Sequence, residues 1–322
     1  MKKLVLSQTC QGAILRDLLL SSPELAEAYQ CLFVPNYALE ADAAKPAAVD
    51  TLVAELPNCD VLIYHDIAAF DFPARLAQLP PGALAIKVPY VTSTIYWPSH
   101  DYRHPCRLAP RGTTALIPWP CRVLNDLIVR LRDEDAIVRA YLDTDLTAGL
   151  DLSRHLADQL DYLHKSQVGT PFALAECVER DFATQRLFHM INHPAMPLMR
   201  HMADVILDHL GMAPLVGERF DPFCMHQLPV HPSVAQGYGL AWCDADTRYY
   251  MLDRDYSFEE YVTVYVRAYV AQYGYASYPA PPAPPRGRAW RRVLRHAVTA
   301  IRHATSVAPQ RGPAMSKPGD VS

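Results

Sequence analysis

Short apolar runs alternate with segments of helical periodicity over about the first hundred residues. Apolar runs of strand length occupy 2–7, 31–35, 60–66 and 82–91. Between them, apolar residues recur at three- and four-residue spacing, as at Ile14, Leu15, Leu18 and Leu19, and again through 46–56 and 73–79. Strands that alternate with helices predict an α/β layer with flanking helices and a mostly parallel sheet.

Helical periodicity dominates the chain after residue 119. It runs through 120–142, 151–167, 195–212 and 257–274, whereas 184–194 reads as a short strand that leads into a loop. Ser257 and Glu260 have the spacing of a capping box, which predicts the start of the last helix. We therefore expect one domain over 1–275, with an α/β part over 1–118 and a helix-rich part over 119–275.

The composition changes near the carboxyl end of the chain. Residues 276–288 are rich in proline and predict a stiff, extended linker. Residues 289–304 place apolar side chains on one helical stripe with arginines beside it, and the rest to 322 is expected to be disordered. Such a basic amphipathic helix favours reversible binding to an anionic membrane, and docking on the globular domain is the alternative.

Composition and charge exclude several classes of protein. The net charge of −4 over 322 residues does not favour nucleic-acid binding. The eight cysteines form no CxxC pair and no zinc-ligand spacing, so we expect no metal site and free thiols in a reducing cytoplasm. No apolar run approaches the length of a membrane span, and no phosphate-binding loop, dinucleotide fingerprint or nucleophile elbow is present.

Cys10 is the first candidate for chemistry. It lies between the apolar run 2–7 and a helical segment that begins near Gly12. The positive end of a helix favours a thiolate, and first-turn N–H groups can receive an oxyanion or a phosphate. Gly12 permits close approach of a ligand or another backbone. The alternative is a small, buried core cysteine.

His193 is the candidate general base. It lies between Asn192 and Pro194, in a polar loop that precedes a helical segment. A loop on a rigid scaffold is a common position for such a group.

Polar residues also follow the predicted strand at 60–66, where Tyr64, His65 and Asp66 would reach the ligand crevice of an open sheet. A turn with a solvated Asp66 is an equal alternative. The stretch 92–105 is rich in aromatic and hydroxyl groups and can line a pocket or form an ordinary loop. For His231, in a loop bounded by prolines, we expect a structural role.

Five segments, taken in order, resemble the WcbI-type polysaccharide biosynthesis proteins. They read LVLSQTCQGAIL, CDVLIYHDI, IKVPYVTSTIYWP, LFHMINHPAMPLMRHMADVIL and LPVHPSVA, and the resemblance spans about residues 3 to 275. The family usually carries Gly-Asn-Cys-Gln where this chain has Gln8-Thr9-Cys10-Gln11, and Gln where it has His65.

The resemblance implies an enzyme of α/β fold with a helical elaboration that binds coenzyme A or acetyl-CoA. It implies O-acetylation of a sugar in a capsular or exopolysaccharide precursor, in the cytoplasm or at the inner face of its membrane. Cys10, or a sugar hydroxyl bound near it, would attack the thioester while His193 acts as base. Gln11 and the Gly12 N–H would stabilise the oxyanion, and His65 or Asp66 would orient the base or contact the acceptor.

The expected coenzyme A contacts are Gly12, Arg16, Tyr64 and Asn192. The layout is also similar, at the level of fold only, to the SGNH hydrolases. Two other functions are therefore open at this point. One is an esterase or deacetylase that uses the same site, and the other is a non-enzymatic, membrane-associated assembly factor.

Overall fold

The structure is a computed structural model that describes residues 1–36, 46–67, 70–101, 108, 117–218, 220–252 and 254–276. The expected linker at 276–288, apart from residue 276, and the expected basic helix at 289–304 lie outside the described residues. No helix in the described part of the chain is long and apolar enough to cross a membrane.

A four-stranded parallel sheet forms the amino-terminal part. Its strands are β1 (Lys2–Ser7), β2 (Tyr29–Phe33), β3 (Val61–Tyr64) and β4 (Leu84–Lys87), in the order β2-β1-β3-β4. The predicted α/β class is therefore confirmed. The strand order reverses between β1 and β3, and in open parallel sheets ligands bind outside the carboxyl ends of the strands at this point.

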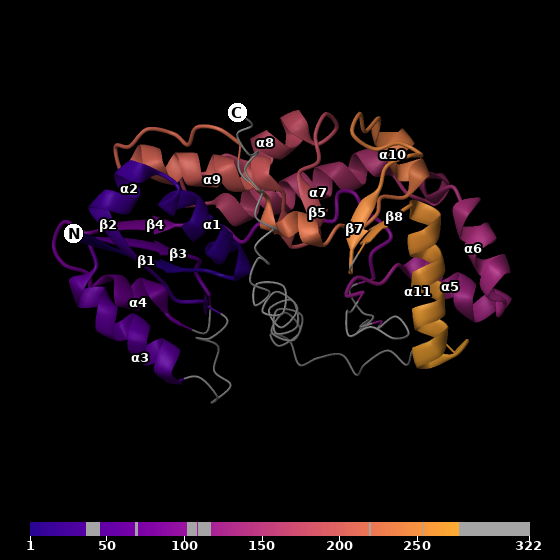
Figure 1. Ribbon diagram of the computed structural model, residues 1–322, viewed down its shortest axis with the longest axis horizontal. Helices are drawn as coiled ribbons and strands as arrows, with labels where there is room; N and C mark the ends of the chain where they lie inside the picture. The colour runs from indigo at the N-terminus through magenta and orange to yellow at the C-terminus, as the bar shows by residue number, and fades with distance from the viewer. Residues whose placement is uncertain are drawn as a thin grey trace, which may run out of the picture.

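Helices cover both faces of the sheet (Figure 1). Alternate residues of β1 enter two separate cores, Leu4 and Leu6 on one face and Val5 on the other. The first face packs against α1 (Cys10–Leu20), α2 (Pro23–Ala28) and α9 (Met196–His209). The second packs against α3 (Pro46–Glu55), the short helix η2 (Leu56–Asn58) and α4 (Phe72–Leu76).

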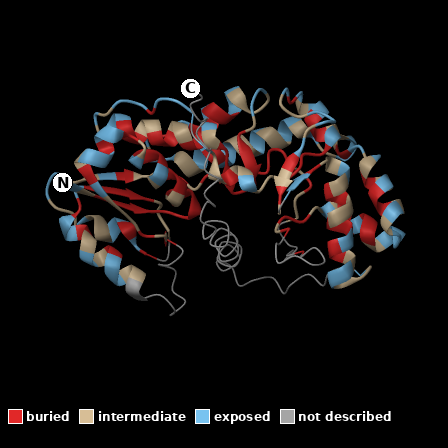
Figure 2. Cartoon of the chain, in the orientation of Figure 1, coloured by how far each residue is buried: buried red, intermediate tan, exposed pale blue. Residues whose placement is uncertain are grey.

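Helices dominate the remainder, as the periodicity predicts. They are α5 (Arg122–Leu131), α6 (Glu134–Leu142), η3 (Leu146–Gly149), α7 (Leu152–Gln167), α8 (Leu174–Asp181), η4 (Pro222–Met225), α10 (Pro232–Tyr238) and α11 (Phe258–Tyr273). Two small hairpins lie between helices along the chain. One pairs β5 (Phe188–Met190) with β6 (His193–Pro194), and the other pairs β7 (Tyr249–Met251) with β8 (Arg254–Tyr256). One buried cluster extends from Leu4 of the sheet to Tyr269 of α11, so both parts share a core (Figure 2).

The helical segment at 120–142 is divided into two helices. Arg132 adopts a left-handed conformation with φ 57°, which ends α5. Asp133 then caps α6 by accepting a hydrogen bond from the Ala136 N–H at 2.8 Å. At the last helix, the capping box of Ser257 and Glu260 is confirmed.

Candidate functional site

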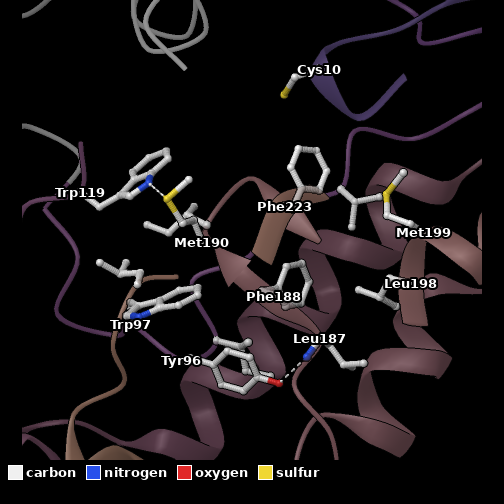
Figure 3. Close-up of a cluster of buried hydrophobic side chains, with 14 of the residues drawn as sticks. Cys10, Tyr96, Trp97, Trp119, Leu187, Phe188, Met190, Leu198, Met199 and Phe223 are labelled. Carbon is white, nitrogen blue, oxygen red and sulfur yellow. Dashed lines mark hydrogen bonds between the residues drawn. The ribbon is translucent and has the colours of Figure 1, made fainter. Parts of the chain in front are cut away.

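Cys10 is the first residue of α1, directly after the carboxyl end of β1. Thr9 is the N-cap of the helix, and its hydroxyl accepts from the Gln11 N–H at 3.4 Å. The Cys10 side chain is buried, with 6% of its surface exposed. It lies at the edge of a cluster of buried side chains that includes Met190 and Phe223 (Figure 3).

The ligand-free thiol is protonated at neutral pH. Burial raises the pKa of Cys10 to about 11. The Thr9 hydroxyl and the backbone N–H groups of Gln11 and Cys10 lower this pKa, but their effect is smaller than that of desolvation. The helix terminus is thus present as predicted, yet it does not by itself produce a thiolate.

Two glutamines next to Cys10 attach this turn to the segment after β4. Gln8 Nε2 donates to the Pro89 carbonyl at 3.1 Å. Gln11 Nε2 donates to the carbonyls of Val91 at 2.6 Å and Asn192 at 3.0 Å, and its Oε1 accepts from the Val91 N–H at 3.1 Å. Both hydrogens of the Gln11 amide are therefore engaged, and Gln11 acts as a clamp between three segments.

Gly12 is required by packing. A Cβ at this position would lie 2.8 Å from atoms of Gln8, Leu6 and Phe33. Its N–H donates to the Thr9 carbonyl at 2.9 Å. The glycine therefore allows α1 to lie close to the sheet, and its N–H already has an acceptor.

His193 begins β6 and is buried without a hydrogen-bonding partner at either ring nitrogen. Its ring stacks on Phe223, with 4.2 Å between centroids. Burial lowers the pKa of His193 to about 3, and the neighbouring His226 and His189 add to this effect. His193 is therefore neutral at physiological pH and able to accept a proton.

Other buried polar atoms near the end of β1 also have no partner. They include the Ser7 hydroxyl, the Gln8 Oε1 and both amide atoms of Asn192. The Asn192 side chain is nevertheless close enough to the Tyr90 hydroxyl to lower its pKa. Buried polar groups are nearly always paired, and a group of unpaired ones is typical of a site that a ligand completes.

His65 and Asp66 follow β3 at the same edge of the sheet. Asn36 Nδ2 donates to His65 Nδ1 at 2.9 Å, and burial lowers the pKa of His65 to about 4. Asp66 pairs with Lys87 at 3.2 Å. The geometry therefore links His65 to the Asn36 amide, and it links Asp66 to a lysine.

Arg16 and Tyr64 lie apart from this group. The Arg16 guanidinium pairs with Asp17 at 2.6 Å, on the partly exposed side of α1. Tyr64 enters the core on the other face of the sheet, where its ring stacks on Phe72 at 4.8 Å. Neither side chain has a contact with Cys10, Asn192 or His193 among the described interactions.

His231 has the structural role that the sequence favours. Its Nδ1 accepts from the Ser233 N–H at 3.2 Å at the start of α10, and its Nε2 lies 3.2 Å from the Tyr141 carbonyl.

Sequence reasoning missed two further polar groups. Tyr90 lies beside Cys10 and was hidden inside the apolar run 82–91. His189 Nε2 lies 2.8 Å from Asp221 Oδ2, which also accepts from the Met196 N–H. The first histidine of FHMINHP was a signal for this pair, whereas nothing in the sequence pointed to Asp221.

A cavity of about 280 Å³ lies at the opposite edge of the sheet. Its lining includes Lys2, Tyr29, Val61 and Leu84, the first residues of the strands, together with His209 at the end of α9. This cavity is therefore separate from Cys10. Among the described residues, no group of histidine, cysteine and acidic side chains is placed to hold a metal ion.

Comparisons with known proteins bear on the family and the fold. A family model described as polysaccharide biosynthesis enzyme WcbI matches residues 3–215. A solved structure described as WcbI, a novel polysaccharide biosynthesis enzyme, covers 94% of this chain and 99% of its own, with 18% identity and a TM-score of 0.69. It is the native protein without a disulfide bond between coenzyme A and a cysteine at position 14 of that protein. A comparison with curated proteins found no match.

Proposed function

Because this chain belongs to the WcbI family of polysaccharide biosynthesis enzymes, we propose that it transfers an acetyl group from acetyl-CoA to a sugar hydroxyl at Cys10. The observation that carries the proposal is a set of buried polar atoms without a partner on the segments around Cys10. They belong to Ser7 and Gln8, just before it, and to Asn192 and His193, on the turn that Gln11 holds. A bound thioester and sugar supply the hydrogen-bonding partners that these atoms lack.

The coenzyme A part of the proposal has separate support. The similar WcbI structure is described in terms of coenzyme A and a cysteine at position 14. Cys10 is the cysteine of this chain closest to that position. We assign it the same relation to coenzyme A, with its sulfur next to the thioester.

The reaction divides into two acyl transfers. In the first, neutral His193 takes the Cys10 proton, the sulfur attacks the thioester carbonyl, and the bond to the coenzyme A sulfur breaks. The departing thiolate takes the proton from His193, which leaves acetyl-Cys10 and free coenzyme A. In the second, His193 takes the proton of a sugar hydroxyl, the oxygen attacks the acetyl carbon, and the bond from that carbon to the Cys10 sulfur breaks. The sulfur then takes the proton from His193, which restores the thiol.

Burial determines when the thiol and the histidine react. A thiol with a pKa of about 11 reacts slowly until a base and a substrate surround it. A histidine with a pKa of about 3 is a weak base, so we expect the proton to move from sulfur to nitrogen only as the sulfur attacks the thioester, with no thiolate formed beforehand. Exchange between two thioesters is nearly balanced in free energy, so the first transfer needs little driving force.

The other residues expected at the site divide into two roles. We assign Gln11 and Gly12 to positioning, because their amide hydrogens already have acceptors. Asn192 and His65 are assigned to the substrates, since they lie at the same edge of the sheet as Cys10. Arg16 and Tyr64 are left out of the coenzyme A site because their partners are elsewhere.

Thermal unfolding with coenzyme A, followed by an acetyl-transfer assay on a panel of sugar acceptors, tests the proposal. Coenzyme A at about 100 times its Kd should stabilise the fold by about 2.7 kcal/mol. Cys10→Ser should keep that shift and lose transfer. The absence of any shift with coenzyme A or acetyl-CoA would contradict the proposal, and hydrolysis without transfer would favour an esterase.

A further inference from the structure

Tyr90 lies beside Cys10, although the two residues are far apart in the chain. Its hydroxyl is close enough to the Cys10 thiol and to the Asn192 side chain for each to shift its pKa. Its ring packs on His65, with 5.8 Å between centroids. Tyr90 thus joins the segment after β4 to the start of α1 and to the turn between β5 and β6.

The backbone on both sides of Tyr90 is fixed by the glutamines that flank Cys10. Gln8 holds the Pro89 carbonyl, and Gln11 exchanges two hydrogen bonds with Val91. The phenol and the thiol therefore belong to one rigid unit. Polar groups that are fixed before the reaction stabilise developing charge without a cost of reorganisation.

The donors in the first turn of α1 do not offset the burial of the Cys10 sulfur, so a thiolate there needs a further hydrogen-bond donor. The Gly12 N–H and both Gln11 amide hydrogens have acceptors elsewhere. The N–H groups of Cys10 and Gln11 act on the sulfur, yet burial still dominates its pKa. Burial also raises the pKa of Tyr90, and the nearby thiol raises it further, so the phenol keeps its proton when the thiol loses one.

We propose that Tyr90 is a catalytic residue whose hydroxyl donates a hydrogen bond to the Cys10 sulfur when His193 removes the thiol proton. In this step one S–H bond breaks and one N–H bond forms on the imidazole. The phenol O–H stays intact, and the electron pair remains on the sulfur. This role rests on the proposed acyl transfer at Cys10, and it assigns the phenol to stabilising the negative charge on the sulfur.

Alkylation of Cys10 by iodoacetamide in the ligand-free protein tests this proposed hydrogen bond. The rate is followed from pH 7 to pH 10, below the pKa of the thiol, by the mass of the peptide that contains Cys10. Tyr90→Phe should raise the pKa of the thiol by about one unit, so the reaction should be about tenfold slower throughout this range. In the transfer assay, kcat should fall about 10- to 100-fold with little change in KM.

Tyr29→Phe is the matched control, because Tyr29 is buried at the opposite end of the sheet. It should leave the alkylation profile unchanged. The other titratable side chains that act on the Tyr90 phenol or pack on its ring are His65 and Tyr162 of α7. Because burial lowers the pKa of His65 to about 4, His65 is neutral throughout this pH range.

A second variant gives a shift of opposite sign. With 3-fluorotyrosine at position 90, the phenol is a stronger donor, so the pKa of the thiol should fall and the reaction should be faster. Unchanged rates in both variants would overturn the role of Tyr90, and so would a slower reaction in both variants, which reports access to the thiol. Alkylation needs no coenzyme A, so a wild-type protein that fails to bind coenzyme A would contradict the proposed function instead.

Discussion

The polar side chains of the site are individually in unreactive states. Burial raises the pKa of Cys10 to about 11 and lowers the pKa of His193 to about 3. A protonated thiol and a neutral imidazole are the reactant states of a proton transfer from sulfur to nitrogen. The side chains are thus set for a proton transfer that accompanies attack on a bound substrate, and not for a permanent thiolate.

His193→Ala should lower kcat by about 10²- to 10⁴-fold, the usual share of a general base. The fold should persist, because the ring of His193 makes no hydrogen bond within the protein. Steady-state kinetics and circular dichroism check both statements. His209→Ala is the control, since His209 is exposed at the end of α9, and equal kcat in both variants would remove His193 from the mechanism.

The sequence indicates Cys10 and His193 as candidates, but it does not indicate their environment. From its place after a strand and before a helix, we predicted that the helix terminus favours the thiolate of Cys10. The predicted place of Cys10 is correct. Burial and the helix terminus have opposite effects on the pKa of Cys10. The size of the burial effect depends on side chains from distant segments, such as Phe223 and Met190. A local pattern contains no information about that packing.

At the scale of elements, the clamp of Gln11 connects three segments that meet only in the folded chain. Its amide joins α1 to Val91 after β4 and to Asn192 between β5 and β6. Without it, three buried backbone groups lose their partner, and each such group costs about 1–3 kcal/mol.

Gln11→Ala should therefore lower the free energy of unfolding by about 2–4 kcal/mol, after partial relaxation of the turn. Denaturant titration measures the loss. Gln236→Ala, on the exposed side of α10, is the matched control and should change stability by less than about 0.5 kcal/mol. A Gln11 variant as stable as the control would show that the clamp does not hold these segments.

Periodicity located the strands of the sheet, the short strand β5 and the longest helices, but it missed β7, β8 and the division between α5 and α6. The four strands and the helices α1, α7, α9 and α11 lie where the pattern predicted. The pattern at 120–142 gave no sign of a break, because the left-handed turn at Arg132 is not marked by glycine. The strands β7 and β8 have three residues each, which is too few for an alternation to be read.

At the scale of the whole molecule, buried histidines make stability depend on pH. Burial lowers the pKa of His65 and His100 to about 4 and of His193 to about 3, while the unfolded value is near 6.5. Above pH 6.5 neither state binds the proton, and the full stability is present. As the pH falls toward 4, only the unfolded chain takes up protons, so stability is lost.

We therefore expect the free energy of unfolding to fall between pH 7 and pH 5 by about 1–2 kcal/mol for each of these histidines. Chemical denaturation at a series of pH values measures the slope. His193→Gln should make the slope shallower, because it removes one of the groups. A stability that is flat or rises toward pH 5 would show that these histidines are not buried as described.

The family and the α/β class could be recognised from the sequence because strands and their flanking motifs are local. The meeting of Cys10, Tyr90 and Asn192 could not, because it depends on how the β5–β6 turn docks against the edge of the sheet. The carboxyl ends of parallel strands lie at one edge of a sheet, so the sequence could place His65, after β3, at the same edge as Cys10, after β1. No comparable rule predicts where the β5–β6 hairpin, about a hundred residues later in the chain, packs against the sheet.

Mass spectrometry of the protein mixed with acetyl-CoA, without a sugar acceptor, tests the central claim most directly. The account predicts one acetyl group on the peptide that contains Cys10, release of one coenzyme A per chain, and loss of the acetyl group when a competent sugar is added. Cys10→Ala should bind acetyl-CoA and show neither event. Sugar acetylation by Cys10→Ala at the wild-type rate would contradict the claim, because the hydroxyl would then attack the thioester without the thiol.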